Sequence, residues 1–372
     1  MSETLVVGRF DEHAREDFRL SAKRAFADAR FCTTVKEAPS MLHGSSPTAI
    51  FLDGAARGVE EFVDWVRAQA HLFSVPVMML VPVPNDHAYN EAHAMGADDV
   101  LLGGDSGGIT RRLANLRDFD PAYRPRQTQG RALLGYPDGG RRRVLGRVLR
   151  QGGFDVSFAS DVEELERVAG QGEAPSLLVA KDDLPTGGAF GAARAIRGRG
   201  MRDVPLVALA GSASAPGMRL EAEQVGSAVV GSDWAPPDHL LFLANELMRP
   251  GVKDIRASER MLFGAICAFR KAGELEPVYG LTYNISREGL YVRTLDPPVN
   301  GTEIWFEMRP PHSPRAVHLR GEAVWSKGLD MPGGAAPPGF GMRINEDACP
   351  PGDLRAYHEA YEAMRRAPIY FN

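Results

Sequence analysis

The sequence contains 372 residues, which is enough for two or three domains that each bury a core of their own. Hydrophobic residues make up 44% and charged residues 24%, as in ordinary globular proteins, and no run of about eighteen apolar residues predicts a membrane-inserted segment. The N-terminus has no basic and then apolar signal region, so we expect a cytoplasmic protein. The net charge of −5 argues against general binding to nucleic acid. The three widely spaced cysteines predict neither a disulfide framework nor a zinc site, and we expect no metal.

Residues 1–118 alternate between the patterns of buried strands and of helices. Short apolar runs fit buried parallel strands at 4–7, 48–52, 75–81 and 99–102. Helical patterns lie between them, for example at 59–71 and 86–95. This alternation predicts a doubly wound α/β domain, and the segment 119–130, rich in Arg, Pro and Gln, predicts a linker after it.

Residues 131–249 repeat the same plan and predict a second α/β domain. Its apolar runs lie at 131–134, 176–180, 204–209 and 228–230. Ser160 and Glu163 have the spacing of a capping box, which predicts that a helix begins there. A second linker, 250–260, leads into the last third of the chain.

Residues 261–372 have the alternating pattern of short antiparallel strands, followed by a helix. We predict strands at 261–269, 289–294, 302–308, 317–325 and 339–344. In the first strand Met261, Phe263, Cys267 and Phe269 share one face, and in the fourth the apolar face ends in Trp325. Strands at this spacing indicate a small antiparallel barrel, and the helical pattern of 353–366 follows it.

Two short motifs carry the chemistry of this last region. Arg256 and Arg260 place two guanidinium groups four residues apart, and Asn284, Ser286 and Gly289 bring an amide, a hydroxyl and a glycine into one turn. Guanidinium groups bind phosphate oxygens or the O6/N7 edge of guanine, and they stack on planar rings. A glycine lets the backbone approach a ligand closely. Together the motifs suit a compact anion that carries purine bases.

The order Arg-x-x-x-Arg and then Asn/Asp-x-Ser-x-x-Gly resembles the PilZ domain, a bacterial receptor module for cyclic di-GMP. The resemblance covers about residues 253–366. It implies a six-stranded antiparallel barrel with a C-terminal helix. It also implies that cyclic di-GMP is bound by Arg256, Arg260, Asn284, Ser286 and Gly289.

The two α/β regions resemble the receiver domain of bacterial response regulators. A receiver holds Mg²⁺ with an acidic pair after its first strand and accepts phosphate on an Asp after its third. In the first region Asp53 stands at the acceptor position, but Gly8 and Arg9 replace the acidic pair. In the second, Lys181 takes the acceptor position and Tyr136 stands in place of an acid. Since Mg²⁺ then lacks its oxygen ligands, we expect two degenerate receivers that serve in contacts with protein partners.

A further hypothesis concerns Arg9, which we expect to pair with Asp53 and to put a fixed cation where the metal would be. The alternative is that Arg9 points into solvent. The sequence has no motif of a nucleotide cyclase, a phosphodiesterase or a nucleotide-binding phosphate loop, so we expect no enzyme activity and no cofactor.

The sequence therefore favours a sensor-adaptor that binds cyclic di-GMP. Binding is expected to order the linker 250–260 against the motif at Asn284–Gly289 and to change the pose of the barrel relative to both receiver-like domains. Two alternatives stay open, which are a scaffold that binds no ligand and a response regulator phosphorylated at Asp53. The sequence also leaves open whether the chain forms a homodimer and which pathway it serves.

Overall fold

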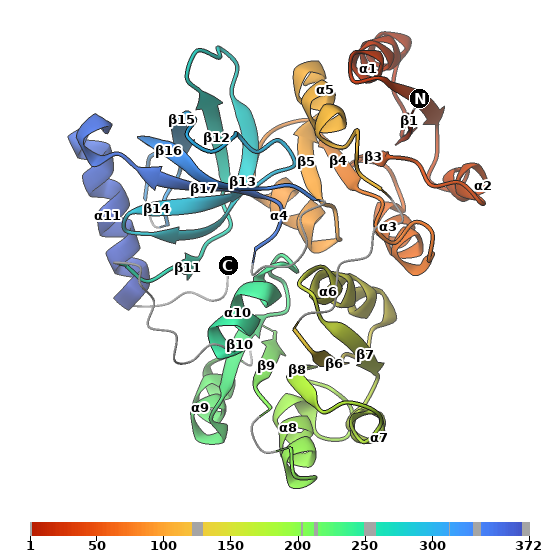
Figure 1. The fold of residues 1–372 in the computed structure, drawn as a ribbon, viewed down its shortest axis with the longest axis vertical. Helices are drawn as coiled ribbons and strands as arrows, with labels where there is room; N and C mark the ends of the chain where they lie inside the picture. Colours follow the sequence, from red (N-terminus) through yellow and green to blue (C-terminus); the bar gives the residue numbers. More distant parts are fainter. Residues whose placement is uncertain are drawn as a thin grey trace. The chain divides into compact units, whose positions relative to one another are not determined.

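The computed structural model describes residues 2–120, 129–201, 204–211, 215–248, 258–311, 313–329 and 336–366. The chain divides into two compact units. Unit 1 consists of Met1–Tyr123 together with Ile255–Met331 and Pro337–Pro368, and unit 2 consists mainly of Arg124–Asp254. An N-terminal α/β domain and a C-terminal barrel therefore share unit 1, although a second α/β domain separates them in the sequence (Figure 1).

The first α/β domain has one parallel sheet in the order β2-β1-β3-β4-β5. Its strands are β1 (Ser2–Val7), β2 (Ala27–Cys32), β3 (Ala49–Asp53), β4 (Val77–Val81) and β5 (Asp99–Leu102). Its helices are α1 (Glu12–Arg24), α2 (Ala38–Leu42), α3 (Val59–Ala68), α4 (Asp86–Ala94) and α5 (Ser106–Asn115). Helices α1 and α5 cover one face and α2, α3 and α4 the other, so that Phe51 packs toward the first group while Ile50 and Leu52 pack toward the second. Burial on both faces explains the uninterrupted apolar runs of the sequence.

The second α/β domain has the equivalent order β7-β6-β8-β9-β10. Its strands are β6 (Arg131–Gly135), β7 (Asp155–Ala159), β8 (Pro175–Lys181), β9 (Leu206–Ala210) and β10 (Ala228–Ser232). Its helices are α6 (Gly139–Gln151), α7 (Val162–Ala169), α8 (Gly188–Gly198), α9 (Ala215–Val225) and α10 (His239–Met248). In both domains the strands follow the 2-1-3-4-5 order of flavodoxin-like folds, so the predicted fold class is confirmed.

The predicted capping box of α7 is wrong by one residue. Asp161, not Ser160, caps the helix, because its Oδ1 accepts a hydrogen bond from the backbone nitrogen of Glu164 (2.7 Å). The Glu164 carboxylate in turn accepts from the backbone nitrogen of Ser160 (2.8 Å). Ser160 and Asp161 are both good capping residues, and each has a Glu three positions later, so the sequence pattern alone does not separate them.

The C-terminal domain is a closed antiparallel barrel. Its strands are β11 (Met261–Leu262), β12 (Ile266–Lys271), β13 (Val278–Ser286), β14 (Gly289–Arg293), β15 (Glu303–Met308), β16 (Val317–Lys327) and β17 (Gly339–Ile344). Six of them form the ring β13-β12-β15-β16-β17-β14, which the pairing of β14 with β13 closes. A 3₁₀ turn (Glu346–Ala348) leads into α11 (Pro351–Arg366), whose Tyr357, Tyr361 and Met364 pack into the barrel core. The predicted barrel and C-terminal helix are confirmed.

Two strand predictions need correction. The predicted strand 261–269 is divided into β11 and β12, and Thr282 holds the break because its Oγ1 donates to the oxygen of Phe263 (2.7 Å) and accepts from the nitrogen of Ala265 (2.9 Å). The face that we assigned to Met261, Cys267 and Phe269 does lie in the core. Strand β13 was not predicted at all.

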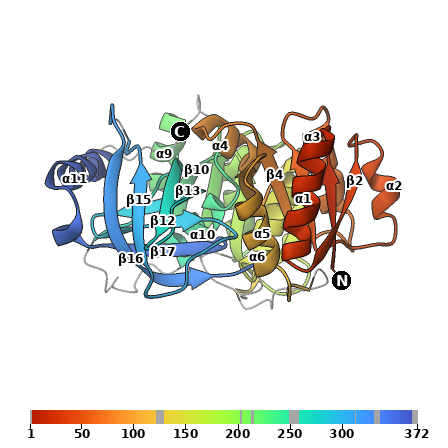
Figure 2. The same cartoon turned by 90° about the horizontal axis from the view of Figure 1, so that it is seen from above.

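Strand β13 lacks an alternating pattern because it is buried on both sides. Its inner face belongs to the barrel core, while its Leu281 lies in the apolar core of the first α/β domain together with residues of α2, α3 and α4. Leu295, just after β14, joins the core beside α1 and α5 in the same way. The views in Figures 1 and 2 show the barrel beside α4, β5 and α5. The two domains of unit 1 thus share hydrophobic cores.

Buried polar groups reinforce this contact. Asp99 at the start of β5 accepts hydrogen bonds from Arg112 Nε (2.6 Å) and from the backbone nitrogen of Leu295 (2.8 Å). Arg293 at the end of β14 donates to the carbonyl oxygen of Ala97 (2.8 Å). Although burial lowers the pKa of Arg112, the nearby carboxylates of Asp99 and Asp296 hold it above its ordinary value, so the guanidinium stays charged.

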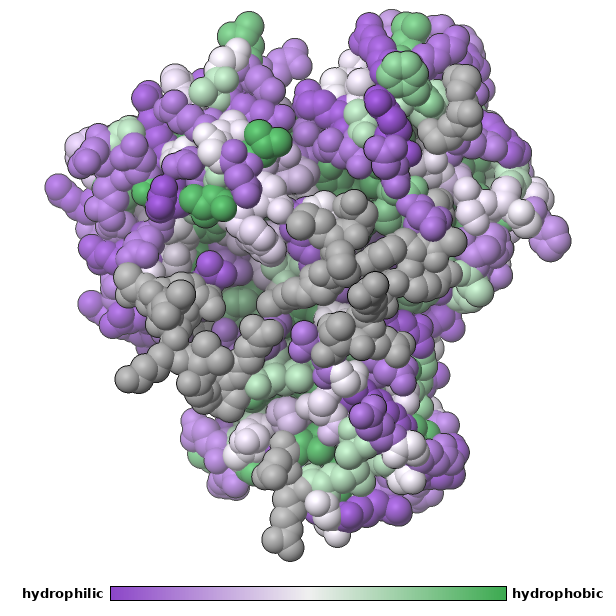
Figure 3. Space-filling model, in the orientation of Figure 1, coloured by the Kyte–Doolittle hydropathy of each residue, from purple (hydrophilic) through white to green (hydrophobic). Residues whose placement is uncertain are grey.

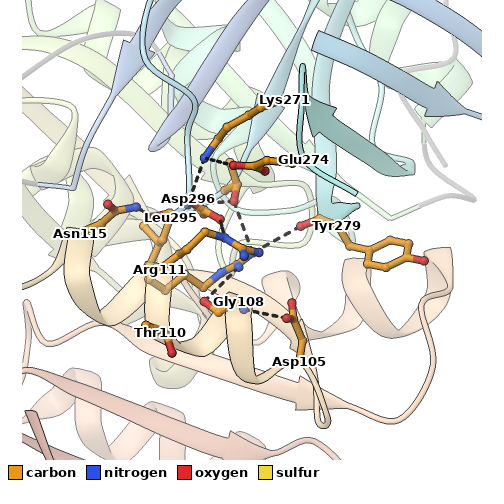
Figure 4. A network of polar contacts seen from close by, with 12 residues as sticks. Asp105, Gly108, Thr110, Arg111, Asn115, Lys271, Glu274, Tyr279, Leu295 and Asp296 are labelled. Atoms are coloured by element: carbon orange, nitrogen blue, oxygen red, sulfur yellow. Dashed lines mark hydrogen bonds and ion pairs between the residues drawn. The ribbon is translucent and has the colours of Figure 1, made fainter. Parts of the chain in front are cut away.

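Figure 4 shows the α5 edge of the same contact. Arg111 points from α5 toward the loop after β14, where its Nε donates to Asp296 Oδ2 (2.6 Å). Lys271 reaches Asp296 from the barrel side at 4.0 Å. Asn115 donates to the carbonyl oxygen of Leu295 (2.9 Å). At the α4 edge, Asp86 accepts from the backbone nitrogen at the start of β12 (2.6 Å).

On the face drawn in Figure 3, hydrophilic residues predominate and hydrophobic ones lie singly or in small groups. None of the helices in the described ranges is long and apolar enough to cross a membrane.

Candidate ligand-binding site

One cavity of the barrel, about 180 Å³ in volume, is lined by residues of both motifs. Arg260 lies just before β11, Asn284 and Ser286 lie on β13, and Gly289 begins β14. These four residues therefore line the same cavity, although up to 29 positions (289 minus 260) separate them in the sequence. Arg256 lies outside the described residues.

The second motif forms a tighter structure than the predicted turn. Asn284 and Ser286 belong to the strand, and only Arg287 and Glu288 connect β13 to β14. Ser286 Oγ donates to the carbonyl oxygen of Gly289 (3.0 Å) and fixes this connection. A Cβ atom at Gly289 would collide with the backbone of β17, so the close approach of the two strands requires glycine here.

Helix α11 holds the backbone of both motif segments through two tyrosine hydroxyls. The hydroxyl of Tyr357 donates to the carbonyl oxygens of Ser286 (2.8 Å) and Gly289 (3.0 Å). One helical turn later, the hydroxyl of Tyr361 donates to the carbonyl oxygen of Glu259 (2.9 Å), next to Arg260. Burial raises the pKa of both tyrosines, so they remain protonated donors at neutral pH. In the sequence these tyrosines were visible only as part of an apolar helical stripe.

The aromatic side chains of Trp325 and Tyr291 line one wall of the cavity, and the prediction for Trp325 was wrong. We predicted Trp325 on the buried face of its strand, but it is 42% exposed. A register shift between Ala323 and Trp325 makes Val324 a bulged residue, which turns Trp325 to the outside. The Trp325 ring lies 5.4 Å from that of Tyr291, centroid to centroid. A prediction that assumes strict alternation of inward- and outward-facing side chains misses such a residue, because a bulge reverses this alternation.

The chemistry of the cavity suits an anion with aromatic rings. Arg260 and Arg343 bring positive charge, Glu288 brings one negative charge, and Asn284 and Ser286 supply neutral donors and acceptors. Arg343 also lies 3.1 Å from Glu322 in an exposed ion pair. Guanidinium groups recognise phosphate oxygens, and an exposed indole offers a surface on which a base can stack.

The comparisons with known proteins assign this region. Residues 254–357 match the family model described as the PilZ domain. The chain contains a PilZ domain. PilZ domains bind cyclic di-GMP and catalyse no reaction, so the match supports a cyclic di-GMP-binding adaptor in general terms. Among curated proteins none matches the sequence.

Solved structures with similar segments are distant from this chain. The chemotaxis response regulator CheY4 of Vibrio cholerae is 20% identical, covers 31% of this chain and 98% of its own, and gives a TM-score of 0.29. A probable two-component response regulator/GGDEF domain protein is 14% identical over 67% of this chain and 99% of its own, with a TM-score of 0.32. The inhibitor of motility MotI/DgrA of Bacillus subtilis is 16% identical over 30% of this chain and 53% of its own, with a TM-score of 0.24. The fold of the two α/β domains therefore rests on their own strand order.

The surroundings of Asp53 differ from the acidic pair that a receiver places beside its acceptor. A Cβ atom at Gly8 would collide with the Asp53 side chain, so an acidic residue does not fit where a receiver has its metal-binding pair. The predicted pair of Arg9 with Asp53 is not formed between these two described residues. Arg9 is exposed, and Asp53 Oδ1 accepts from the backbone nitrogen of Ala55 (3.0 Å).

In the second α/β domain the charges of a receiver are reversed. Lys181 ends β8 at the acceptor position, and its Nζ lies 3.6 Å from the carboxylate of Asp233, which follows β10. The hydroxyl of Tyr136 donates to Asp233 Oδ1 (2.8 Å), and burial together with this carboxylate raises the pKa of Tyr136. Lys181 also lies 3.4 Å from Asp183. Across the described part of the chain, no three His, Cys, Asp or Glu side chains are arranged to hold a metal.

Proposed function

We propose that this protein is a cyclic di-GMP-responsive adaptor whose own chemistry is binding. The observation that carries the proposal is the convergence of Arg260, Asn284, Ser286 and Gly289 on one cavity of the PilZ barrel. Residues from two separate motifs, anchored by one helix, meet around a space with positive charge and an exposed indole.

The residues have distinct roles in this proposal. Arg260, together with Arg256 from the linker, contacts the phosphates or the O6/N7 edge of guanine. Asn284 and Ser286 orient the ligand through hydrogen bonds, Gly289 allows its close approach, and Trp325 stacks on a base. The cavity of about 180 Å³ is smaller than the pockets of about 300–1,000 Å³ that usually hold small ligands, so we assign the remaining contacts to the segment that carries Arg256.

The proposed change of pose involves only the second α/β domain, whereas the sequence analysis expected the barrel to move relative to both α/β domains. Because the first α/β domain and the PilZ barrel share hydrophobic cores, the ligand is not expected to change their mutual pose. Unit 2 instead lies between the two parts of unit 1 in the sequence, so the linkers 119–130 and 250–260 connect it at both ends. Ordering of the second linker by the ligand would change the pose of unit 2 and thereby the contacts that the protein makes with a partner.

Calorimetric titration of the full chain with cyclic di-GMP tests the proposal. We expect low-micromolar or tighter binding that Arg260→Ala and Ser286→Ala each weaken about ten- to a hundredfold, because each lost charge-assisted contact costs about 1.5–3 kcal/mol. Arg194→Ala serves as the control, because Arg194 is an exposed arginine of the second α/β domain that pairs with Glu221. Equal affinity of all variants would contradict the site, and the absence of binding would favour the scaffold alternative.

A further inference from the structure

A second hollow of the barrel, about 340 Å³ in volume, shares no lining residue with the cavity described above. We call it the Trp305 groove. It lies on the outer face of β12, β15 and β16 and extends to the loop after β12. Its lining includes Ala268, Arg270, Leu275, Trp305, His318 and Arg320.

The strand register builds the groove around one indole. Arg270, Trp305 and Arg320 are direct neighbours across β12, β15 and β16, so their side chains stand in one row on the outer face. The guanidinium carbons lie 4.5 Å (Arg270) and 4.4 Å (Arg320) from the centroid of the indole ring. In the next row, Ala268 occupies the position beside Glu307, and its small side chain leaves the hollow open.

The guanidinium N–H groups of both arginines have no hydrogen-bond acceptor among the described residues. In the described ranges of the chain, neither the Arg270 nor the Arg320 guanidinium has a hydrogen-bond acceptor or a carboxylate partner; their contacts are with the indole. Stacking uses the flat face of a guanidinium group and leaves its N–H edge available. Beside them, Trp305 is 40% exposed and Leu275 is 88% exposed. Arg and Trp are the side chains that most often dominate the energy of protein interfaces.

From this arrangement we propose that the Trp305 groove docks an acidic segment of a protein partner. One or two carboxylates of the segment pair with Arg270 and Arg320, and an aliphatic or aromatic side chain packs on Trp305 and Leu275. The proposal is independent of the cyclic di-GMP site and adds a place where an adaptor makes contact with its partner.

The surroundings favour a polypeptide over a nucleic acid. Glu303 and Glu307 are exposed on the same strand as Trp305, and they would repel a continuous phosphate backbone. A chain with a net charge of −5 also opposes a polyanion. A short segment with one or two carboxylates meets less of this repulsion than a chain of phosphates, although Glu307 also lines the groove. Since β12, β15 and β16 are each paired on both sides, the segment is recognised by its side chains and not by strand addition.

The test follows the Trp305 signal by ¹⁹F NMR in the full chain labelled with 5-fluorotryptophan. This signal is assigned as the one that is missing in Trp305→Phe. The probes are capped pentapeptides X-Glu-X-Glu-X in which X is Leu, Phe or Trp. We expect at least one of them to shift the Trp305 resonance with submillimolar affinity, and the charge-removing variant Arg270→Gln/Arg320→Gln to weaken this binding about tenfold or more. The matched X-Lys-X-Lys-X peptides should not bind. Arg260→Ala should leave peptide binding unchanged, which separates this site from the nucleotide site.

Four results would overturn the proposal. One is the absence of a saturable Trp305 shift with every acidic peptide at millimolar concentration. Another is equal binding of the lysine peptides, and a third is an unchanged affinity of the double glutamine variant whose circular dichroism matches the wild type. The fourth is a shift with single-stranded oligothymidylate and none with the peptides, which would assign the groove to nucleic acid.

Discussion

Replacing Asp99 by Asn tests whether the first α/β domain and the PilZ barrel form one folding unit. Asp99 is 1% exposed and accepts from Arg112 Nε (2.6 Å) and from the backbone nitrogens of Leu295 (2.8 Å) and Val100 (2.9 Å). Asn keeps the size and one acceptor oxygen, but it removes the carboxylate that pairs directly with the equally buried Arg112 guanidinium. Removing one partner of a buried pair costs about 3–5 kcal/mol, which is a large part of the usual 5–15 kcal/mol of domain stability.

Urea unfolding followed by tryptophan fluorescence measures this loss. Trp234 belongs to unit 2, so a Trp234→Phe background leaves Trp65 in the first α/β domain and Trp305 and Trp325 in the barrel as the reporters of unit 1. Glu322→Gln is the control, because it breaks an exposed ion pair with Arg343 that is expected to contribute about 0–1 kcal/mol. The reasoning is refuted if Asp99→Asn costs no more than this control, or if the Trp234→Phe protein without the Asp99 substitution unfolds in two separate transitions.

Three further predictions follow from individual side chains. Tyr357→Phe removes the hydroxyl that holds the carbonyl oxygens of Ser286 and Gly289, so it should weaken cyclic di-GMP binding about tenfold in calorimetry, whereas Tyr279→Phe should not. Burial and the neighbouring Arg293 lower the pKa of His93 well below 6.5, so the unfolded state takes up this proton first as the pH falls. The free energy of unfolding should therefore decrease below about pH 6.5, by up to about 1.4 kcal/mol per pH unit. Urea titrations of His93→Gln at several pH values should lack this part of the slope. Acetyl phosphate with Mg²⁺ should leave the mass of the protein unchanged, and a gain of one phosphoryl group that Asp53→Asn abolishes would revive the response-regulator alternative.

The sequence predicted the architecture where burial produces a regular pattern. The α/β domains were recognisable because strands covered on both faces consist of apolar runs such as Ile50–Leu52, with helices between them. The described motif residues do line one cavity, and the glycine at its centre is required by the approach of two backbones. The domain boundaries and the ligand roles of the motif residues stay predictions.

The rest depended on contacts between distant parts of the chain. Strand β13 carries residues typical of turns and faces two cores, so it shows no period. Trp325 was placed on the wrong face because one bulged residue reverses the alternation. No sequence pattern marked Asp99 and Arg293 as buried charges, and both lie in the contact between the barrel and the first α/β domain.

The central claim is that the cavity at Arg260 recognises cyclic di-GMP, and it is tested most directly by comparing the affinities of the wild-type chain for cyclic di-GMP and cyclic di-AMP. Adenine presents an amino group where guanine presents the O6 acceptor, so a guanidinium group that binds the O6/N7 edge discriminates by about 1–3 kcal/mol, or about 5- to 150-fold. The account predicts low-micromolar or tighter binding of cyclic di-GMP and weaker binding of cyclic di-AMP by at least the lower of these factors. Equal affinities, or no binding of cyclic di-GMP, would contradict it.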